Sequence, residues 1–323
     1  MTNNIKTICK THRNDPKTCA AELRDLRPTQ SQVAHWSLYC ASIGYKEIFE
    51  MCVKHIDAAS PPIDPNQLLL EACVGGNTDI LLMVLEKYRD RIFTQDYPQR
   101  LRLDKPLEHL CTTQQQPMLD TLLQWAGEEG KKVGVTPFAV VKNLLRAKGS
   151  PLIKIYVTQF LPQLALRAPG HPQIELVAIA IRCCEIDNHV DFPWIVSHLP
   201  AEACTDGLYH TLMKEATERR SLEILRYLSD PSVLEKFSLE AYGSAHISSL
   251  HGAAILALYQ ATSQKNLEVL HTLFDLHPYE KWGPGWNTPR YQEKMTQFYA
   301  DYLKARLEKE VESTSFAPKN RKM

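Results

Sequence analysis

The chain of 323 residues contains 44% apolar and 23% charged residues, and its 37 Lys and Arg residues balance 37 Asp and Glu residues. These values are ordinary for globular proteins and exclude a chain that is disordered throughout. The balanced charge gives no overall field that would favour nucleic acid or an anionic membrane as a partner.

The N-terminal stretch MTNNIKTICKTHRNDPKTC is polar, so we expect no secretory signal. The densest apolar run, IELVAIAI (Ile174–Ile181), is far shorter than the ~20 residues that cross a bilayer, so we expect no membrane span. Nine cysteines are an odd number, and most lie in apolar helical runs. This pattern predicts buried, reduced thiols in a cytoplasmic protein, with a nuclear location as the alternative.

Residues 1–30 contain RNDPKT and RDLRPTQ on either side of a short helical candidate, Cys19–Leu26. Because the segment is mostly polar, it is expected to be either an N-terminal cap on the following structure or a frayed tail.

The stretch LLLEACVGGNTDILLMVLEKY (Leu68–Tyr88) predicts two short helices joined by a glycine turn. The same pattern returns along the chain about seven times. Its anchor residues are Cys40, Ala72, Cys111, Leu145, Cys184, Ala216 and Ala261.

Apolar residues recur at fixed distances from these anchors. Eight residues after them stand Ile48, Ile80, Leu119, Ile153, Phe192, Ile224 and Val269. Four before them stand Trp36, Leu68, Leu107, Val141, Ala180, Leu212 and Ala257, and twelve after them stand Cys52, Val84, Leu123, Val157, Val196, Leu228 and Leu273. Spacings of four place these residues on one helix face, which predicts the core of each helix pair.

The turns have their own signals. Gly44, Gly76 and Gly149 lie four residues after their anchors, where a helix end favours a residue that tolerates φ > 0. One residue later a side-chain oxygen is predicted to cap the second helix, at Asn77, Ser150, Ser221 and Asn266. Proline opens several second helices, at Pro117, Pro151 and Pro193.

The segment ACVGGNTDILLMVLE resembles the helix–turn–helix core of an ankyrin repeat, and SLHGAA (Ser249–Ala254) and KPLEHLC are looser versions of the family's TPLHxA helix opening. The resemblance implies an all-α, ankyrin-like α-solenoid of about seven stacked helical hairpins over residues 31–277. It also implies that His251 holds a turn by local hydrogen bonding. The TPLH motif is mostly absent and several units are long, so a generic helical-hairpin solenoid is the structural alternative.

The C-terminal part is expected to close the array. HPYEKWGPGWNTPRY (His277–Tyr291) predicts a loop, and Thr288–Pro289 an N-cap followed by a helix to about Val311. The apolar face of this capping helix is Met295, Phe298, Tyr302, Leu303, Leu307 and Val311. The predicted domains are therefore a cap or tail (1–30), the array (31–277), the aromatic loop and capping helix (278–312), and a disordered basic tail (313–323) with PKNRK as a weak nuclear-import candidate.

No sequence motif of hydrolases, nucleotide-binding proteins or metalloenzymes is present, so we predict no catalytic residues, no cofactor and no metal site. His271, Asp275 and His277 could form a metal site, but solvated polar side chains are the preferred interpretation.

The candidate contact residues are the aromatic side chains of the loop, Tyr279, Trp282, Trp286 and Tyr291. They either pack on the last hairpin or anchor a partner, because Trp and Tyr dominate interface energetics. Two long connections, Tyr97–Lys105 and Phe237–Ser249, supply further candidates, Arg100, Arg102, Lys105 and Tyr242.

The sequence thus predicts a non-enzymatic scaffold that binds another protein on its concave face and loops, with no nucleic acid as partner and a small-molecule ligand left open. One alternative is an enzyme, a microbial effector or a biosynthetic enzyme, whose pocket is built on a degenerate repeat scaffold. The other is a homotypic assembly module.

Overall fold

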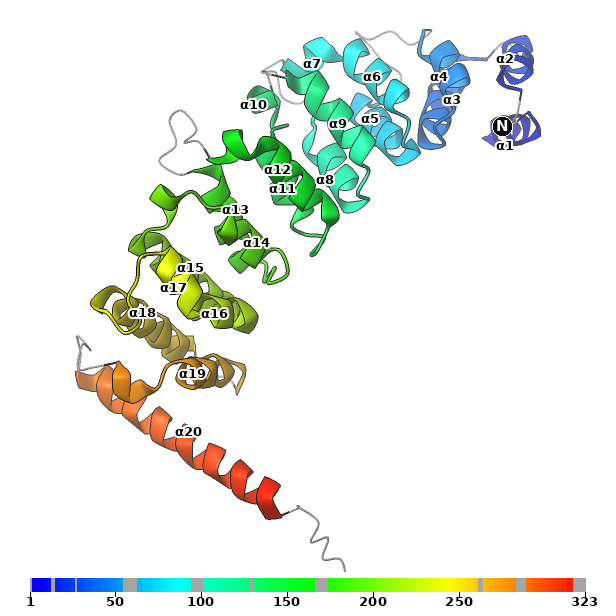
Figure 1. Cartoon of the computed structure of the whole chain (residues 1–323). Helices are drawn as coiled ribbons and strands as arrows, with labels where there is room; N and C mark the ends of the chain where they lie inside the picture. The colour runs from blue at the N-terminus through cyan, green and yellow to red at the C-terminus, as the bar shows by residue number, and fades with distance from the viewer. Residues whose placement is uncertain are drawn as a thin grey trace, which may run out of the picture. The chain divides into compact units, whose positions relative to one another are not determined.

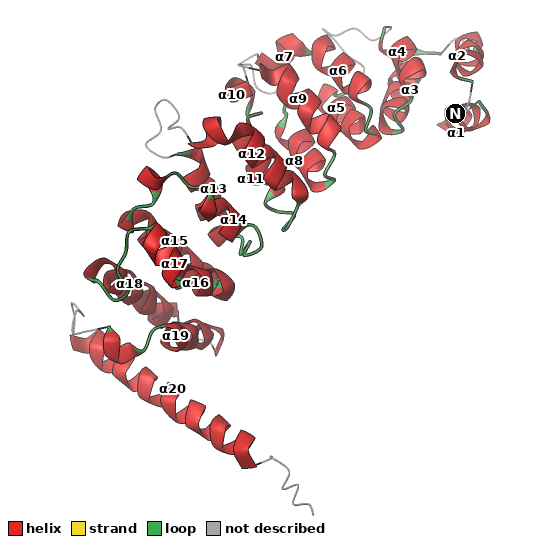
Figure 2. Ribbon diagram, in the orientation of Figure 1, coloured by secondary structure: helices red, strands yellow, loops and turns green. Residues whose placement is uncertain are grey.

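The computed structural model describes residues 2–12, 15–26, 28–54, 63–93, 101–127, 130–165, 174–260, 264–282 and 289–315. Within these residues the secondary structure is helical and contains no β-strand (Figure 2), which confirms the all-α prediction. No helix in this part of the chain is long and apolar enough to cross a lipid bilayer. The chain forms two compact units, Met1–Leu164 and Ala165–Met323.

The first unit consists of short helices that follow one another in pairs (Figure 1). They are α1 (Thr2–Thr11), α2 (Pro16–Asp25), α3 (Gln30–Ser42), α4 (Lys46–Val53), α5 (Pro65–Gly75), α6 (Thr78–Lys87), α7 (Arg89–Phe93), α8 (Asp104–Thr112), α9 (Gln116–Ala126), α10 (Gly130–Val133), α11 (Pro137–Leu144) and α12 (Pro151–Ala165). First helices contact in chain order, α3 with α5, α5 with α8 and α8 with α11, and second helices do so in α4, α6 and α9. Each pair therefore covers an apolar face of its neighbour.

The second unit repeats this arrangement. Its helices are α13 (Glu175–Glu185), α14 (Phe192–Ser197), α15 (Asp206–Arg219), α16 (Leu222–Leu228), α17 (Pro231–Lys236), α18 (Ser244–Gln260), α19 (Gln264–Leu276) and α20 (Pro289–Ser315), with short 3₁₀ turns η2 (Ala201–Ala203) and η3 (Tyr279–Lys281). The first helices contact in the order α13, α15, α18, and α16 contacts α19. The boundary between the units falls inside the predicted array, between its fourth and fifth helix pairs.

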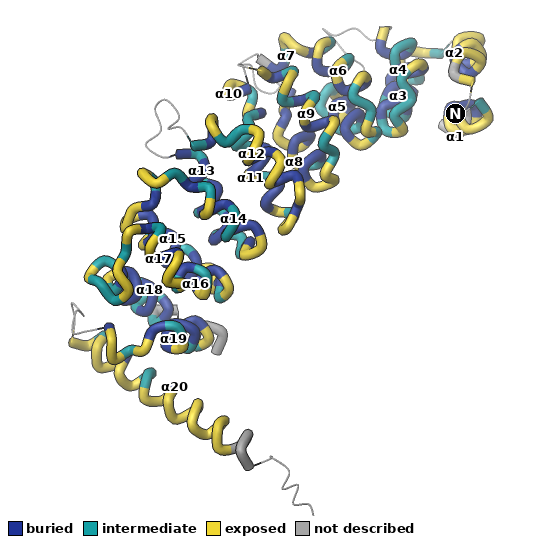
Figure 3. The backbone as a smooth tube through the Cα atoms, in the orientation of Figure 1, coloured by how far each residue is buried: buried dark blue, intermediate teal, exposed yellow. Residues whose placement is uncertain are grey.

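The predicted core positions lie inside the protein. All seven residues four before the anchors are buried, and so are those twelve after the anchors except Leu123, which is half-buried. Figure 3 shows the result as buried segments on the facing sides of paired helices. The local apolar spacing therefore identified the packed face of every predicted pair.

The turns confirm the three predicted glycines and correct the register elsewhere. Gly44, Gly76 and Gly149 have φ values of 72°, 66° and 74°. The same left-handed position is occupied without glycine by Gln114, Asp187 and Arg220. In the third and fifth pairs the turn closes with bonds from Gln115 N to Leu110 O (3.0 Å) and from Asn188 N to Cys183 O (2.8 Å). The structural anchors there are Leu110 and Cys183, one residue before the predicted Cys111 and Cys184.

The predicted cap residues have a second role between neighbouring pairs. Asn77 caps α6 by accepting from the N–H groups of Asp79 and Ile80, and its Nδ2 donates to Gly44 O at 3.0 Å. Ser221 makes no capping bond, and its hydroxyl donates to Cys184 O at 3.4 Å.

Ser150 likewise donates to the preceding turn, to Gln114 Oε1 at 3.3 Å. Asn266 lies inside α19, because that helix begins at Gln264, so the prediction of a cap there was wrong. The oxygen-bearing residue in these turns thus also joins one helix pair to the previous one.

The N-terminal segment is a further packed helix pair. α1 contacts α2, α2 contacts α4, and the apolar side chains Ile5, Cys9, Cys19 and Leu23 are buried. All nine cysteines lie in the described part of the chain, where each is buried and none forms a disulfide.

The capping helix covers the last pair with only part of its predicted face. Met295 and Tyr302 of α20 are buried, whereas Leu303, Leu307 and Val311 are exposed, so the prediction for these three was wrong. The reason is length, because α20 has 27 residues against 13 in α19, about 40 Å against about 20 Å. The C-terminal half of α20 therefore extends past its packing partner.

Candidate partner-binding site

Buried aromatic side chains between residues 274 and 302 of the second unit form a cluster, which we call the aromatic base. Phe274 of α19 packs against Trp282 and against Tyr302 of α20, with ring centroids 5.9 and 5.5 Å apart. Trp282 is 0% exposed, and its indole N–H donates to His277 O at 2.9 Å. Trp282 is therefore a packing residue, which corrects its assignment as a contact anchor. Of the two alternatives for the aromatic loop, packing on the last hairpin applies to this side chain.

Half-buried tyrosines pack against this aromatic base. Tyr279 lies 5.5 Å from Trp282 and 5.2 Å from Tyr299 of α20, measured between ring centroids. The Tyr299 hydroxyl donates to Glu280 Oε1 at 2.7 Å. Burial and the Glu280 carboxylate raise the pKa of Tyr299 to about 12, so its hydroxyl stays protonated near neutral pH. Both rings are thus fixed while keeping exposed area.

The loop between α17 and α18 brings Tyr242 to the same end of the unit. Tyr242 has a φ of 63°, and its ring lies 6.0 Å from His277 and beneath Lys281 Nζ at 5.1 Å. The structure therefore joins two regions that the sequence could only name separately. We define the terminal tyrosine surface as Tyr242, Tyr279, Lys281 and Tyr299. The predicted connection is also shorter than expected, because α18 begins at Ser244.

Two buried histidines support this surface from below. His246 is 1% and His277 3% exposed, and their ring centroids lie 4.9 Å apart. His246 Nδ1 accepts from the backbone N–H of Tyr242 at 3.0 Å, and His277 Nε2 lies 2.8 Å from Ser229 Oγ. Burial lowers the pKa of each to about 4, helped in His277 by the nearby His246, so both imidazoles are neutral at pH 7.

The other predicted contact residues are dispersed. Tyr291 is half-buried in the first turns of α20, and is therefore helical and not part of a loop. Arg100 and Trp286 lie outside the described residues.

Arg102 and Lys105 belong to the first unit. The Arg102 side chain is exposed and pairs with Asp104 at 3.3 Å, while its N–H donates to Asn66 Oδ1 at 2.7 Å. Lys105 is exposed in the first turn of α8, which begins at Asp104 and shortens the predicted connection.

The histidines singled out by motif have packing partners. His251 lies inside α18, 6.0 Å from the Trp282 ring, so the implied turn-holding role was wrong. Asp275 accepts from the Tyr302 hydroxyl and pairs with Arg306 at 3.6 Å, and His271 lies 5.2 Å from Tyr302. Within the described residues no group of three or more His, Cys, Asp or Glu side chains is placed to hold a metal ion.

Sequence reasoning missed Tyr299, Lys281 and His246. Tyr299 follows Phe298 on the predicted capping helix, and adjacent aromatic residues point to different sides of a helix. That spacing was the available signal for a second aromatic face on α20.

Comparison with known proteins adds no relative. No protein-family model matches the chain, and searches of curated proteins and of solved structures find no significant match.

Proposed function

We propose that this protein is a non-enzymatic, ankyrin-like repeat protein that binds another protein through the terminal tyrosine surface. The stacked helix pairs and the turn-to-turn bonds within each unit support a repeat architecture. The observation that carries the binding role is the set of half-exposed tyrosines held on a buried aromatic base.

This arrangement suits binding because the rings are fixed before a partner arrives. A tyrosine offers a large contact area and a hydroxyl, and it loses little conformational entropy when its ring is already packed. A central aromatic anchor contributes about 2 kcal/mol or more to binding, roughly a thirtyfold change in Kd. Lys281 and Glu280 add one charge of each sign at the edge, where they would orient a polar partner.

Catalysis is the weaker alternative. The histidines with lowered pKa, His246 and His277, are the residues that a catalytic pocket near Tyr242 would use. Both side chains are enclosed by protein and at most 3% exposed, so a substrate has no direct approach to either ring. Their neutrality is explained by packing under the tyrosines.

The test is affinity capture with quantitative mass spectrometry from a cell extract. A Tyr242→Ser/Lys281→Glu double variant removes a tyrosine and its cation, and Tyr279→Ser removes a second ring. A matched control is Tyr39→Ser/Lys6→Glu, because Lys6 Nζ lies 5.8 Å over the half-buried Tyr39 ring in the first unit.

We expect that proteins captured by both the wild type and the control are depleted at least tenfold in captures with either surface variant. The affinity of each partner is then measured with purified proteins. If the surface variants and the control capture the same proteins at the same level, the proposed surface is wrong.

A further inference from the structure

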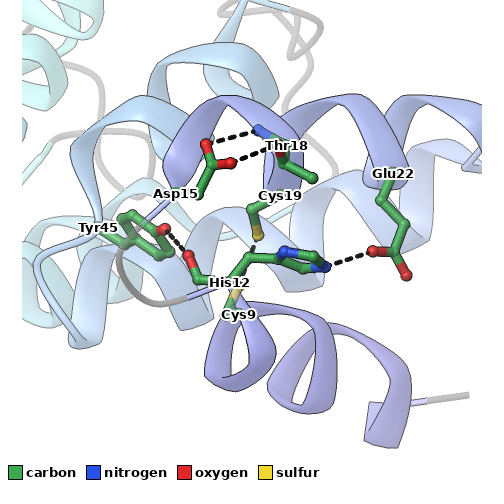
Figure 4. A network of polar contacts seen from close by, with 7 residues as sticks. All are labelled: Cys9, His12, Asp15, Thr18, Cys19, Glu22 and Tyr45. Carbon is green, nitrogen blue, oxygen red and sulfur yellow. Dashed lines mark hydrogen bonds and ion pairs between the residues drawn. The ribbon is translucent and has the colours of Figure 1, made fainter.

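Two thiols face each other between the first two helices. Cys19 of α2 lies with its Sγ 3.9 Å from the Sγ of Cys9 on α1, and both side chains are buried (Figure 4). A third thiol, that of Cys40 on α3 in the next helix pair, also acts on the pKa of Cys9. This cluster belongs to the first unit, whereas the terminal tyrosine surface belongs to the second, and the cluster has no part in the proposed binding role.

The three thiols are electrostatically unequal. The hydrogen bond from Cys40, with a weaker one from Cys19, outweighs burial and lowers the pKa of Cys9 to about 7. Burial raises the pKa of Cys19 to about 12, and the pKa of Cys40 is raised as well because it donates to Cys9. By comparison, burial alone raises the pKa of the isolated Cys73 thiol to about 12. Cys9 is therefore the thiol of this cluster that becomes a thiolate near neutral pH.

A surface pocket gives small molecules a route to Cys9. Its volume is about 490 Å³, and its lining includes Cys9, Lys6, Lys10 and Tyr45. Cys19 does not line this pocket and is 0% exposed. An oxidant that enters the pocket would therefore meet Cys9 first, with Cys19 behind it.

We propose that Cys9 and Cys19 form a hydroperoxide-sensitive dithiol, in which Cys9 is the nucleophile and Cys19 the resolving thiol. The Cys9 thiolate attacks one oxygen of the hydroperoxide, the O–O bond breaks, and the other oxygen leaves and takes a proton. Cys9 is then a sulfenic acid. Cys19 loses its proton and attacks the Cys9 sulfur, the S–O bond breaks, and hydroxide leaves as water. The two thiols lose two electrons in total, and one hydroperoxide is reduced to an alcohol and one water, or, in the case of hydrogen peroxide, to two waters.

The cross-link would change how α1 is attached to the protein. In the reduced chain the helix pair α1 and α2 is held by buried apolar side chains such as Ile5 and Leu23, together with exposed polar contacts such as His12 Nε2 to Glu22 Oε2 at 2.8 Å. The Tyr45 hydroxyl also donates to His12 O at 3.0 Å (Figure 4). Exposed polar contacts contribute little to stability, so a disulfide between α1 and α2 would add to the apolar packing and hold the N-terminal helix pair more firmly.

The experiment oxidises the reduced 323-residue chain with hydrogen peroxide, blocks the remaining thiols under denaturing conditions, and maps the peptides by mass spectrometry. We expect the first equivalent of peroxide to remove two thiols and to yield one linked peptide pair, Cys9 with Cys19. Hydrogen exchange of α1 should slow at least tenfold in this product and return to its initial rate on reduction.

Variants separate the two roles. Cys19→Ser should leave a Cys9 sulfenic acid that a dimedone probe traps, whereas Cys9→Ser should lose no thiols at the same peroxide dose. Cys73→Ser is the control and should react like the wild type. Circular dichroism checks that each variant is folded, and Cys9→Ala replaces Cys9→Ser if the serine variant is not. A Cys9–Cys40 product, thiol loss spread over other cysteines, or no loss at a dose that oxidises free cysteine would each overturn the proposal.

Discussion

The imidazole rings of His246 and His277 meet edge to face, 4.9 Å apart and inclined at 77°, although 31 positions separate the two residues in the sequence. Three further groups surround this pair. They are Tyr209 of α15, 5.9 Å from His246; Tyr242, which contacts both rings; and Ser229, bonded to His277. A cation, Lys281, lies above Tyr242, and Nε2 of His246 has no hydrogen-bond partner among the described residues. The site therefore holds two neutral imidazoles, with no anion among these neighbours to stabilise a protonated ring.

This pair should make the second unit sensitive to acid. Burial lowers the pKa of both histidines from 6.5 to about 4. The stabilising contribution is complete above about pH 6.5 and is lost as the pH falls towards about 4, because the unfolded chain binds the protons first. At full effect it is on the order of 3 kcal/mol for each imidazole. Thermal melts between pH 8 and pH 4 measure this loss.

A substitution isolates the effect of one ring. His246→Asn keeps an oxygen that can accept from the Tyr242 N–H but cannot be protonated. Its melting temperature should therefore fall less between pH 7 and pH 5 than that of the wild type, whereas the exposed His35→Asn control should follow the wild type. Parallel pH profiles for all three proteins would contradict this account of the pair.

Position 75 should tolerate no residue larger than glycine. A Cβ built there would lie 1.9 Å from Ala41 O and 2.8 Å from Gly44 N, because α3 and α5 approach closely at their ends. The contacted atoms are backbone, which cannot move away independently, so Gly75→Ala should destabilise the first unit by about 1–3 kcal/mol or more. Gly207→Ala in the first turn of α15, with Thr205 Oγ1 3.8 Å away, should be neutral or slightly stabilising. Urea unfolding of the two variants makes the comparison.

The assignment of the buried face of α6 can be tested by substituting two adjacent leucines. Leu81 is buried between helices and Leu82, the next residue, is exposed. Leu81→Ala should cost about 2–5 kcal/mol in the free energy of unfolding, because it removes buried methyl groups and leaves a cavity. Leu82→Ala should cost about 0.5 kcal/mol or less. Equal losses in denaturant unfolding would mean that the helix face is assigned wrongly.

The helix pairs were predictable because their signal is local. The apolar spacing around Ala72 or Ala216 depends only on the helical repeat, which fixes the buried face whatever the neighbours are. The turn register at Gln114 and Asp187 was not predictable in this way. A left-handed residue is usually glycine, and these two positions adopt it with side chains that carry no such signal.

The site was predictable in composition and less so in geometry. The sequence shows that Tyr279 and Trp282 lie on a segment too short to form a core, but a three-residue separation does not decide which ring turns inward. The direction is set by tertiary contacts, namely the bond from Trp282 to His277 O and the Phe274 ring. Tyr242 joined the surface through a contact with Lys281, a pairing across 39 positions that no local pattern records.

The docking of α20 on the last helix pair gives the final prediction. Tyr302 is 7% exposed, its ring packs on Phe274, and its hydroxyl donates to Asp275, whereas Leu307, little more than one turn further on, is 61% exposed. Tyr302→Ala should therefore destabilise the second unit by about 3–5 kcal/mol and speed hydrogen exchange in α19. Leu307→Ala should change neither measurement, since its side chain lies beyond the end of the helix pair that α20 covers. If Leu307→Ala proved as damaging as Tyr302→Ala, the C-terminal half of α20 would have to pack against the protein, and the assigned end of the docked segment would be wrong.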